Sequence, residues 1–139
     1  MWISFPVFQV SLKRTLNVAE HLQLGEALAS LRHEGVLVVG SGHTTHNTVD
    51  LSPESAPSWV QTFVGWIHEV LVDPELSPEQ RNAKLLAAHT EPTFAKAHPR
   101  AEHFLPLAVA AAAAGYERGQ VMYEEFLFGS LFCSHIKFS

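Results

Sequence analysis

Cysteine, basic clusters and long apolar runs are scarce in this sequence, and each absence excludes a class of protein. Cys133 is the one cysteine, so the chain cannot form an internal disulfide or a CxxC-type metal site. Nine lysines and arginines against fourteen acidic residues form no basic run, so neither nucleic acid nor an anionic membrane is an expected partner. No stretch is long and apolar enough to span a bilayer. These absences favour a cytoplasmic protein that binds a small molecule.

The composition is that of a globular protein. Apolar residues make up 47% of the 139 residues, which is enough to build a buried core. No internal repeat or low-complexity linker divides the sequence. We therefore expect a single domain over residues 1–139.

The segment 36–47, with the sequence VLVVGSGHTTHN, organises the predicted fold. Its four leading apolar residues are typical of a strand buried on both faces of a parallel sheet. Phe5–Leu12 is predicted to form an earlier strand, and Val18–Arg32 a helix between the two. This order predicts a parallel βαβ unit. The loop after its second strand would face a ligand crevice, which makes the loop histidines candidate site residues.

Further helices and a strand pair are expected after this unit. Apolar residues from Trp59 to Val70 repeat at helical spacing, and Ser77 is placed to cap a second helix. A third helix is predicted over Glu102–Ala114, because Pro106 fits only near a helix start. Residues 121–128 and 131–138 read as an antiparallel pair. The prediction is an α/β fold with a mixed central sheet, a parallel βαβ unit, flanking helices and a C-terminal antiparallel strand pair.

Four of the nine histidines occur as two pairs. His43 and His46 form the first pair, and His98 and His103 form the second pair around Glu102. Imidazole and carboxylate are ligands that suit Fe(II) and Zn(II) in proteins. Spacing alone leaves the alternative open that these are exposed or hydrogen-bonded loop residues.

Three separated blocks carry a resemblance to a known family. The blocks ISFPVFQVSL, LGEALASLRHEGVLVVGSGHTTHN and AHPRAEHFLPLAVAAAAAG resemble the C-terminal half of the class III extradiol ring-cleavage dioxygenases. These form the LigB-like superfamily, and the similarity is to its DOPA 4,5-dioxygenase type. SGHTTHN matches the SG-x-x-x-HN motif of the family, and HPRAEH matches its HP-x-x-EH motif.

The resemblance implies an enzyme that opens a catechol-type ring with O₂ at a non-haem divalent metal, most often Fe(2+) and alternatively Zn(2+). It implies that His46 lies beside the metal as an acid/base group or as a ligand. It also implies that Glu102 or His103 supplies a ligand, and we favour His103. We also predict that His43, His98 and Arg100 contact the substrate, Arg100 through its bidentate fork.

One departure from the family leaves other functions open. Family members carry two further metal-binding histidines before the strand that matches PVFQVSL, so we expect this chain alone to bind metal weakly. We also expect exposed apolar surface, and therefore self-association or pairing with a complementing N-terminal half. The alternatives are an inactive truncated remnant or binding module that retains the fold, and a zinc metalloprotein of the same superfamily.

Overall fold

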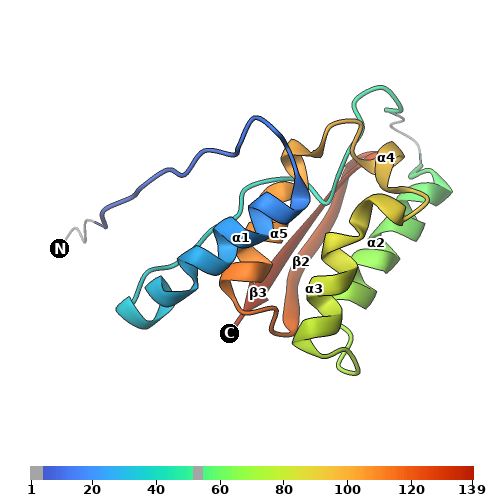
Figure 1. The fold of residues 1–139 in the computed structure, drawn as a ribbon. Coiled ribbons are helices and arrows are strands. Elements are labelled where there is room, and N and C mark those ends of the chain that lie inside the picture. Colours follow the sequence, from blue (N-terminus) through green and yellow to red (C-terminus); the bar gives the residue numbers. More distant parts are fainter. Residues whose placement is uncertain (1–4, 52–54) are drawn as a thin grey trace.

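The computed structural model describes residues 5–51 and 55–139. In this part of the chain a two-residue strand separates the first helical segment from a run of further helices, and the two long strands come last (Figure 1). The α-helices are α1 (Val18–Leu28), α2 (Ser58–Leu71), α3 (Pro78–Leu86), α4 (Phe94–Ala97) and α5 (Leu105–Ala113). The 3₁₀ helices are η1 (Ala29–Glu34), η2 (Ala88–Thr90) and η3 (Ala101–His103), and the strands are β1 (Thr45–His46), β2 (Gly119–Phe128) and β3 (Leu131–Phe138).

The sheet is antiparallel throughout, with the strand order β1-β3-β2. β2 and β3 form a long hairpin, which confirms the predicted C-terminal strand pair. β1 adds only two residues to the outer edge of β3, pairing Thr45 with Phe132 and His46 with Leu131. The loop that carries His43 and His46, which we call the histidine loop, therefore enters the sheet at Thr45.

The parallel βαβ unit predicted from the sequence is absent from the described residues. Phe5–Leu12 and the run from Val36 to Val39 are extended but belong to no strand, and Leu37 and Val39 are 84% and 74% exposed. A strand needs a hydrogen-bonded neighbour, because its backbone groups cannot pair within the segment itself. The apolar pattern predicts the extended course of both segments, but among residues 5–51 and 55–139 neither has the hydrogen-bonded neighbour that would make it a strand.

Helix boundaries follow the local signals in the sequence. The backbone N–H of Gln80 donates to the Ser77 hydroxyl, and the backbone N–H of Ser77 donates to the side-chain oxygen of Gln80. These two hydrogen bonds form the predicted capping box. α1 ends in the 3₁₀ turn η1, which Gly35 closes with a φ of 76°. α5 begins three residues later than the predicted Glu102, because η3 precedes it, and Pro106 lies in its first turn.

Two helical layers enclose the core. α1 packs along α5, and α2 with α3 forms the second helical pair (Figure 1). The apolar residues that repeat from Trp59 to Val70 pack into the core, since Trp59, Phe63 and Val70 are buried and Trp66 is partly buried against them. Phe104 and Leu105 bury the start of α5 in the same cluster. This packing fixes the end of η3, where His103 lies, relative to the loop that carries His43 and His46.

Candidate functional site

The histidine loop is anchored to the hairpin by side-chain hydrogen bonds. The Thr45 hydroxyl donates to the Ser130 carbonyl at 2.7 Å and accepts from the Phe132 N–H at 3.0 Å. The Ser130 hydroxyl donates to the Asn47 carbonyl at 2.5 Å. Thr45 and Ser130 are fully buried, so each bond is shielded from competing water. The loop is thus held on both sides of His46.

Gly42 lets the same loop touch the segment that carries the second motif. A Cβ built on Gly42 would collide with the backbone carbonyl of His103. Only glycine allows the two backbones to approach this closely. The contact brings residues 42 and 103 together across the fold, and it sets the separation of the two histidine motifs.

Three imidazoles meet at this contact. The rings of His46 and His103 are stacked, with centroids 3.6 Å apart and an angle of 16° between their planes. The His43 ring lies 5.5 Å from that of His46 and 5.3 Å from that of His103, and its Nδ1 is 3.4 Å from Nδ1 of His103. We call His43, His46 and His103 the histidine cluster. All three side chains are partly buried, so a ligand in solvent can reach them.

The environments of His43 and His103 favour neutral imidazole. Burial lowers the pKa of His43 below its ordinary value, and the neighbouring His46 lowers it further. Burial likewise lowers the pKa of His103, and His46 and then His43 add to that effect. Neutral imidazole is the form that binds a metal or accepts a proton. At neutral pH His43 and His103 are therefore set up for either role.

His98 occupies a different position from the one predicted for a substrate contact. It is only 3% exposed and lies among the rings of Phe63, Phe94 and Phe104. Its Nε2 is 2.9 Å from the Thr44 carbonyl, which requires Nε2 to carry the proton and donate. Burial lowers its pKa to about 4. His98 is thus a neutral core residue that holds the histidine loop through its hydrogen bond to the Thr44 carbonyl.

Glu102 and Arg100 face each other at the surface. The Arg100 Nε lies 3.2 Å from a Glu102 carboxylate oxygen, and the Arg100 side chain is 75% exposed. Burial acts to raise the pKa of Glu102, but a backbone hydrogen bond and Arg100 outweigh it and lower the pKa overall. The Glu102 carboxylate is directed to Arg100, whereas the adjacent His103 is directed to the cluster. The choice of His103 over Glu102 as the metal ligand stays a prediction.

The nitrogen donors of the cluster are chemically suited to Fe(II) or Zn(II). Within residues 5–51 and 55–139, no three His, Cys, Asp or Glu side chains surround one metal position. Imidazole lone pairs lie in the ring plane, so those of two rings stacked at 16° lie in nearly parallel planes and do not converge on one position. In this arrangement one ring of the pair can supply a metal ligand, and further ligands would complete the set.

Sequence reasoning missed the residues that hold the loop. Thr44, Thr45 and Asn47 anchor it, and Asn47 also donates from Nδ2 to the Lys96 carbonyl at 2.9 Å. Their polar side chains lie between and beside the histidines in SGHTTHN. This run of polar residues is the signal that could have predicted an anchored loop. Ser130 had no comparable signal, because it looks like an ordinary turn residue.

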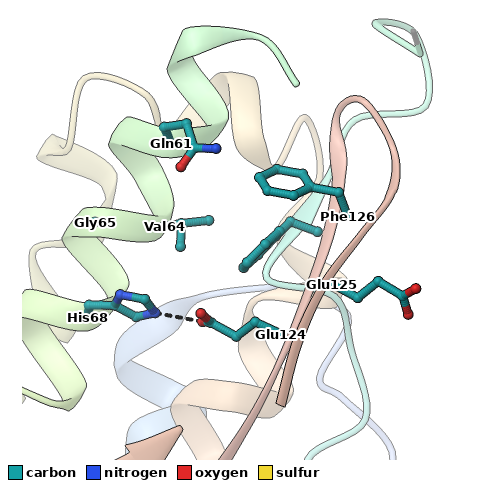
Figure 2. A pocket seen from close by; sticks show the side chains of 8 residues that line it. Gln61, Val64, Gly65, His68, Glu124, Glu125 and Phe126 are labelled. Carbon is teal, nitrogen blue, oxygen red and sulfur yellow. Dashed lines mark hydrogen bonds and ion pairs between the residues drawn. The ribbon is translucent and has the colours of Figure 1, made fainter. Parts of the chain in front are cut away.

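A second polar group lies between α2 and β2, lining a pocket of about 580 Å³. Figure 2 shows His68 and Glu124 facing each other there, while Glu125 points away. The His68 Nε2 is 2.6 Å from a Glu124 oxygen, and the Ser134 hydroxyl donates to that same oxygen at 2.8 Å. These contacts join the helix to the hairpin, so His68 has a structural role.

Comparison with known proteins identifies the class. The family model described as the catalytic LigB subunit of aromatic ring-opening dioxygenase matches residues 1–138. The chain belongs to this family, as the two histidine motifs predicted. None of the helices in the described part of the chain has the length and hydropathy needed to cross a bilayer.

Individual relatives are named for a particular activity. The chain is 39% identical over 112 residues to 4,5-DOPA dioxygenase extradiol of Beta vulgaris, covering 79% of this chain and 40% of that protein. It is 32% identical over 137 residues to the Portulaca grandiflora protein of the same name, covering 96% and 49%. The crystal structure of the uncharacterized protein JW3007 from Escherichia coli K12 superposes with a TM-score of 0.68 at 28% identity, over 86% of this chain and 49% of that one. The chain thus spans less than half the length of these relatives.

Proposed function

We propose that this chain supplies the histidine cluster of an extradiol dioxygenase that opens a catechol-type ring with O₂. In this reaction the bond next to the two hydroxyl-bearing carbons breaks, and both oxygen atoms of O₂ enter the product. The observation that carries the proposal is the contact of His46 with His103, which joins two motifs 57 positions apart at a ring separation of 3.6 Å. Membership of the LigB family supports it.

Each cluster residue has a role in this proposal. His46 accepts the proton of a catechol hydroxyl at a ring nitrogen and returns a proton later, a task suited to imidazole near neutral pH. His103 holds a divalent metal, for which Fe(2+) is our choice and Zn(2+) the alternative. When bound, the metal brings the catecholate and O₂ together. His43 and Arg100 contact the substrate, and Arg100 binds a carboxylate if the substrate carries one. We place this activity in the cytoplasm.

Reconstitution tests the proposal. The N-terminal half of the Beta vulgaris relative would be folded together with this chain, loaded with Fe(II), and supplied aerobically with DOPA or catechol. Absorbance of the yellow ring-opened product reports activity. We expect product from the assembled complex, because the relative supplies the half that this chain does not match.

Two variants separate the roles of the cluster. His103→Ala should lose bound metal and activity together, since a ligand holds the ion. His46→Ala should lower turnover by roughly 10²–10⁴-fold while retaining more metal. His33→Ala is the matched control, because His33 is an exposed histidine on η1 outside the cluster. A complex shown to be folded and metal-loaded that yields no product would contradict the enzyme proposal and favour an inactive remnant.

A further inference from the structure

In the role proposed for it, His103 presents one ring nitrogen to a metal and keeps a proton on the other. A neutral imidazole carries a single N–H, so the nitrogen that does not bind the ion is a hydrogen-bond donor. Metal-binding histidines commonly donate this N–H to a neighbouring group, which fixes the orientation of the ring. The position of the acceptor therefore decides which nitrogen of His103 remains for the metal.

The structure offers one acceptor to His103. The adjacent carboxylate of Glu102 is bonded to Arg100 instead. The His46 ring is stacked on the His103 ring, so it presents its face and not an in-plane lone pair. The His43 ring is inclined to that of His103 by 63°, and the two Nδ1 atoms are 3.4 Å apart. Within residues 5–51 and 55–139, His43 alone is hydrogen-bonded to a ring nitrogen of His103.

Backbone contacts hold His43 close to His103. A Cβ built on Gly42, the residue before His43, would collide with the His103 carbonyl. Thr44 and Thr45, which follow His43, are buried and accept hydrogen bonds from β3. The distance of 3.4 Å is at the long end of the hydrogen-bond range. Both flanks of His43 are fixed, however, so the pair stays within reach.

We propose that His43 is a positioning residue for His103: Nδ1 of His103 donates to Nδ1 of His43, and Nε2 of His103 is left for the metal. This inference rests on the metal role proposed for His103, and it does not require ring cleavage. In the opposite arrangement His43 donates, the proton of neutral His103 is on Nε2, and that nitrogen cannot bind the ion. Metal binding at Nε2 thus selects one direction of the hydrogen bond.

The same hydrogen bond determines what His43 offers to the substrate. Because Nδ1 of His43 accepts, the proton of its neutral ring is on Nε2. That nitrogen is then a donor, and its partner is an acceptor such as a catecholate or carboxylate oxygen. The substrate contact proposed for His43 is therefore a hydrogen bond that His43 donates.

Nitrogen NMR of the histidine side chains tests the direction of the hydrogen bond. The full ¹⁵N-labelled chain would be titrated with Zn(II), which is diamagnetic, and the ring-nitrogen shifts report protonation and metal binding at each histidine separately. At saturation we expect zinc on Nε2 of His103, a proton on its Nδ1, and no proton on Nδ1 of His43. A proton on Nδ1 of His43, or zinc on Nδ1 of His103, would overturn the proposal.

Two substitutions of similar shape test whether the acceptor matters. Asparagine places a carbonyl oxygen near the position of Nδ1 in His43, whereas leucine has no acceptor. The zinc dissociation constant at His103, taken from the same titration, should rise by roughly 10–100-fold in His43→Leu. His43→Asn should restore most of the affinity. His33→Leu is the matched control, because His33 is exposed and lies outside the cluster, and it should bind zinc at His103 as the wild type does.

The outcomes separate this inference from the proposed function. If His103→Ala leaves zinc binding unchanged, His103 is no ligand, and both its metal role and the positioning role of His43 are refuted. If His103→Ala weakens zinc binding but His43→Leu does not, the positioning role alone is overturned. Equal losses in His43→Leu and His43→Asn would also overturn it, because the hydrogen-bond acceptor would then not be what matters at this position.

Discussion

Burial of His98 makes the stability of this protein depend on pH in a definable window. The folded state lowers the His98 pKa from 6.5 to about 4, chiefly through burial, although the hydrogen bond to the Thr44 carbonyl acts in the opposite direction. The folded chain therefore binds fewer protons than the unfolded chain between these values. The stability contributed by neutral His98 is complete above pH 6.5 and is lost as the pH falls toward 4.

The size of this effect follows from the pKa difference. One pKa unit corresponds to about 1.4 kcal/mol, so a shift of this size amounts to about 3 kcal/mol by pH 4. The structural reason is that the Nδ1 of His98 is buried without a partner. A proton added there would place an unpaired charge among three phenylalanine rings.

Chemical denaturation at a series of pH values measures the effect, and His98→Gln is the control. Glutamine has an amide N–H that can donate to the Thr44 carbonyl, but it does not titrate. Carboxylates that titrate near pH 4 affect both proteins equally, so the difference between the two curves isolates His98. We expect the wild type to lose about 3 kcal/mol more than His98→Gln between pH 6.5 and 4. Parallel curves would refute the assignment of His98 as a neutral core residue.

Three further predictions test other parts of the structure. The isolated chain should bind Fe(II) or Zn(II) weakly at neutral pH, because the cluster offers only part of a ligand set, and tight stoichiometric binding in calorimetry would contradict this. Gly42→Ala should lower the melting temperature, at a cost of about 1–3 kcal/mol, because the new Cβ collides with the His103 carbonyl; an unchanged melting temperature would count against the close approach. Ser77→Ala should lower the free energy of unfolding in urea by about 1 kcal/mol, because α3 loses its N-cap. The same substitution at Ser139, which is exposed and caps no helix, should leave that free energy unchanged.

Local signals predicted local structure well. The Ser77 capping box, the position of Pro106 in the first turn of α5 and the β2–β3 hairpin each depend on a few neighbouring residues, and the structure contains all three. The prediction of a parallel strand pair was wrong, because a strand depends on a hydrogen-bonded partner elsewhere in the chain. The apolar pattern of Val36 to Val39 reports burial potential and says nothing about what pairs with it.

The sequence indicated which histidines to compare but not how they are arranged. The two motifs indicated His46 and His103 as candidate site residues, and the structure places their rings in contact. The division between surface and core was not readable, because His98 and His103 occur in one short motif and yet only His98 is buried. Which histidine faces the core depends on the turn at η3 and on the surrounding phenylalanine rings, and spacing does not encode either.

The hydrogen bonds between the histidine loop and the hairpin turn have a consequence for how the protein opens. Thr45 and Asn47 are bonded to Ser130 and Phe132, more than eighty positions away in sequence. A fluctuation that releases the loop must break these bonds, so the loop and the hairpin turn belong to one cooperative unit. Amide hydrogen exchange at residues 45–47 should then follow that of residues 130–132, and the lifetime of the contact between His46 and His103 is set by the hairpin rather than by the loop itself.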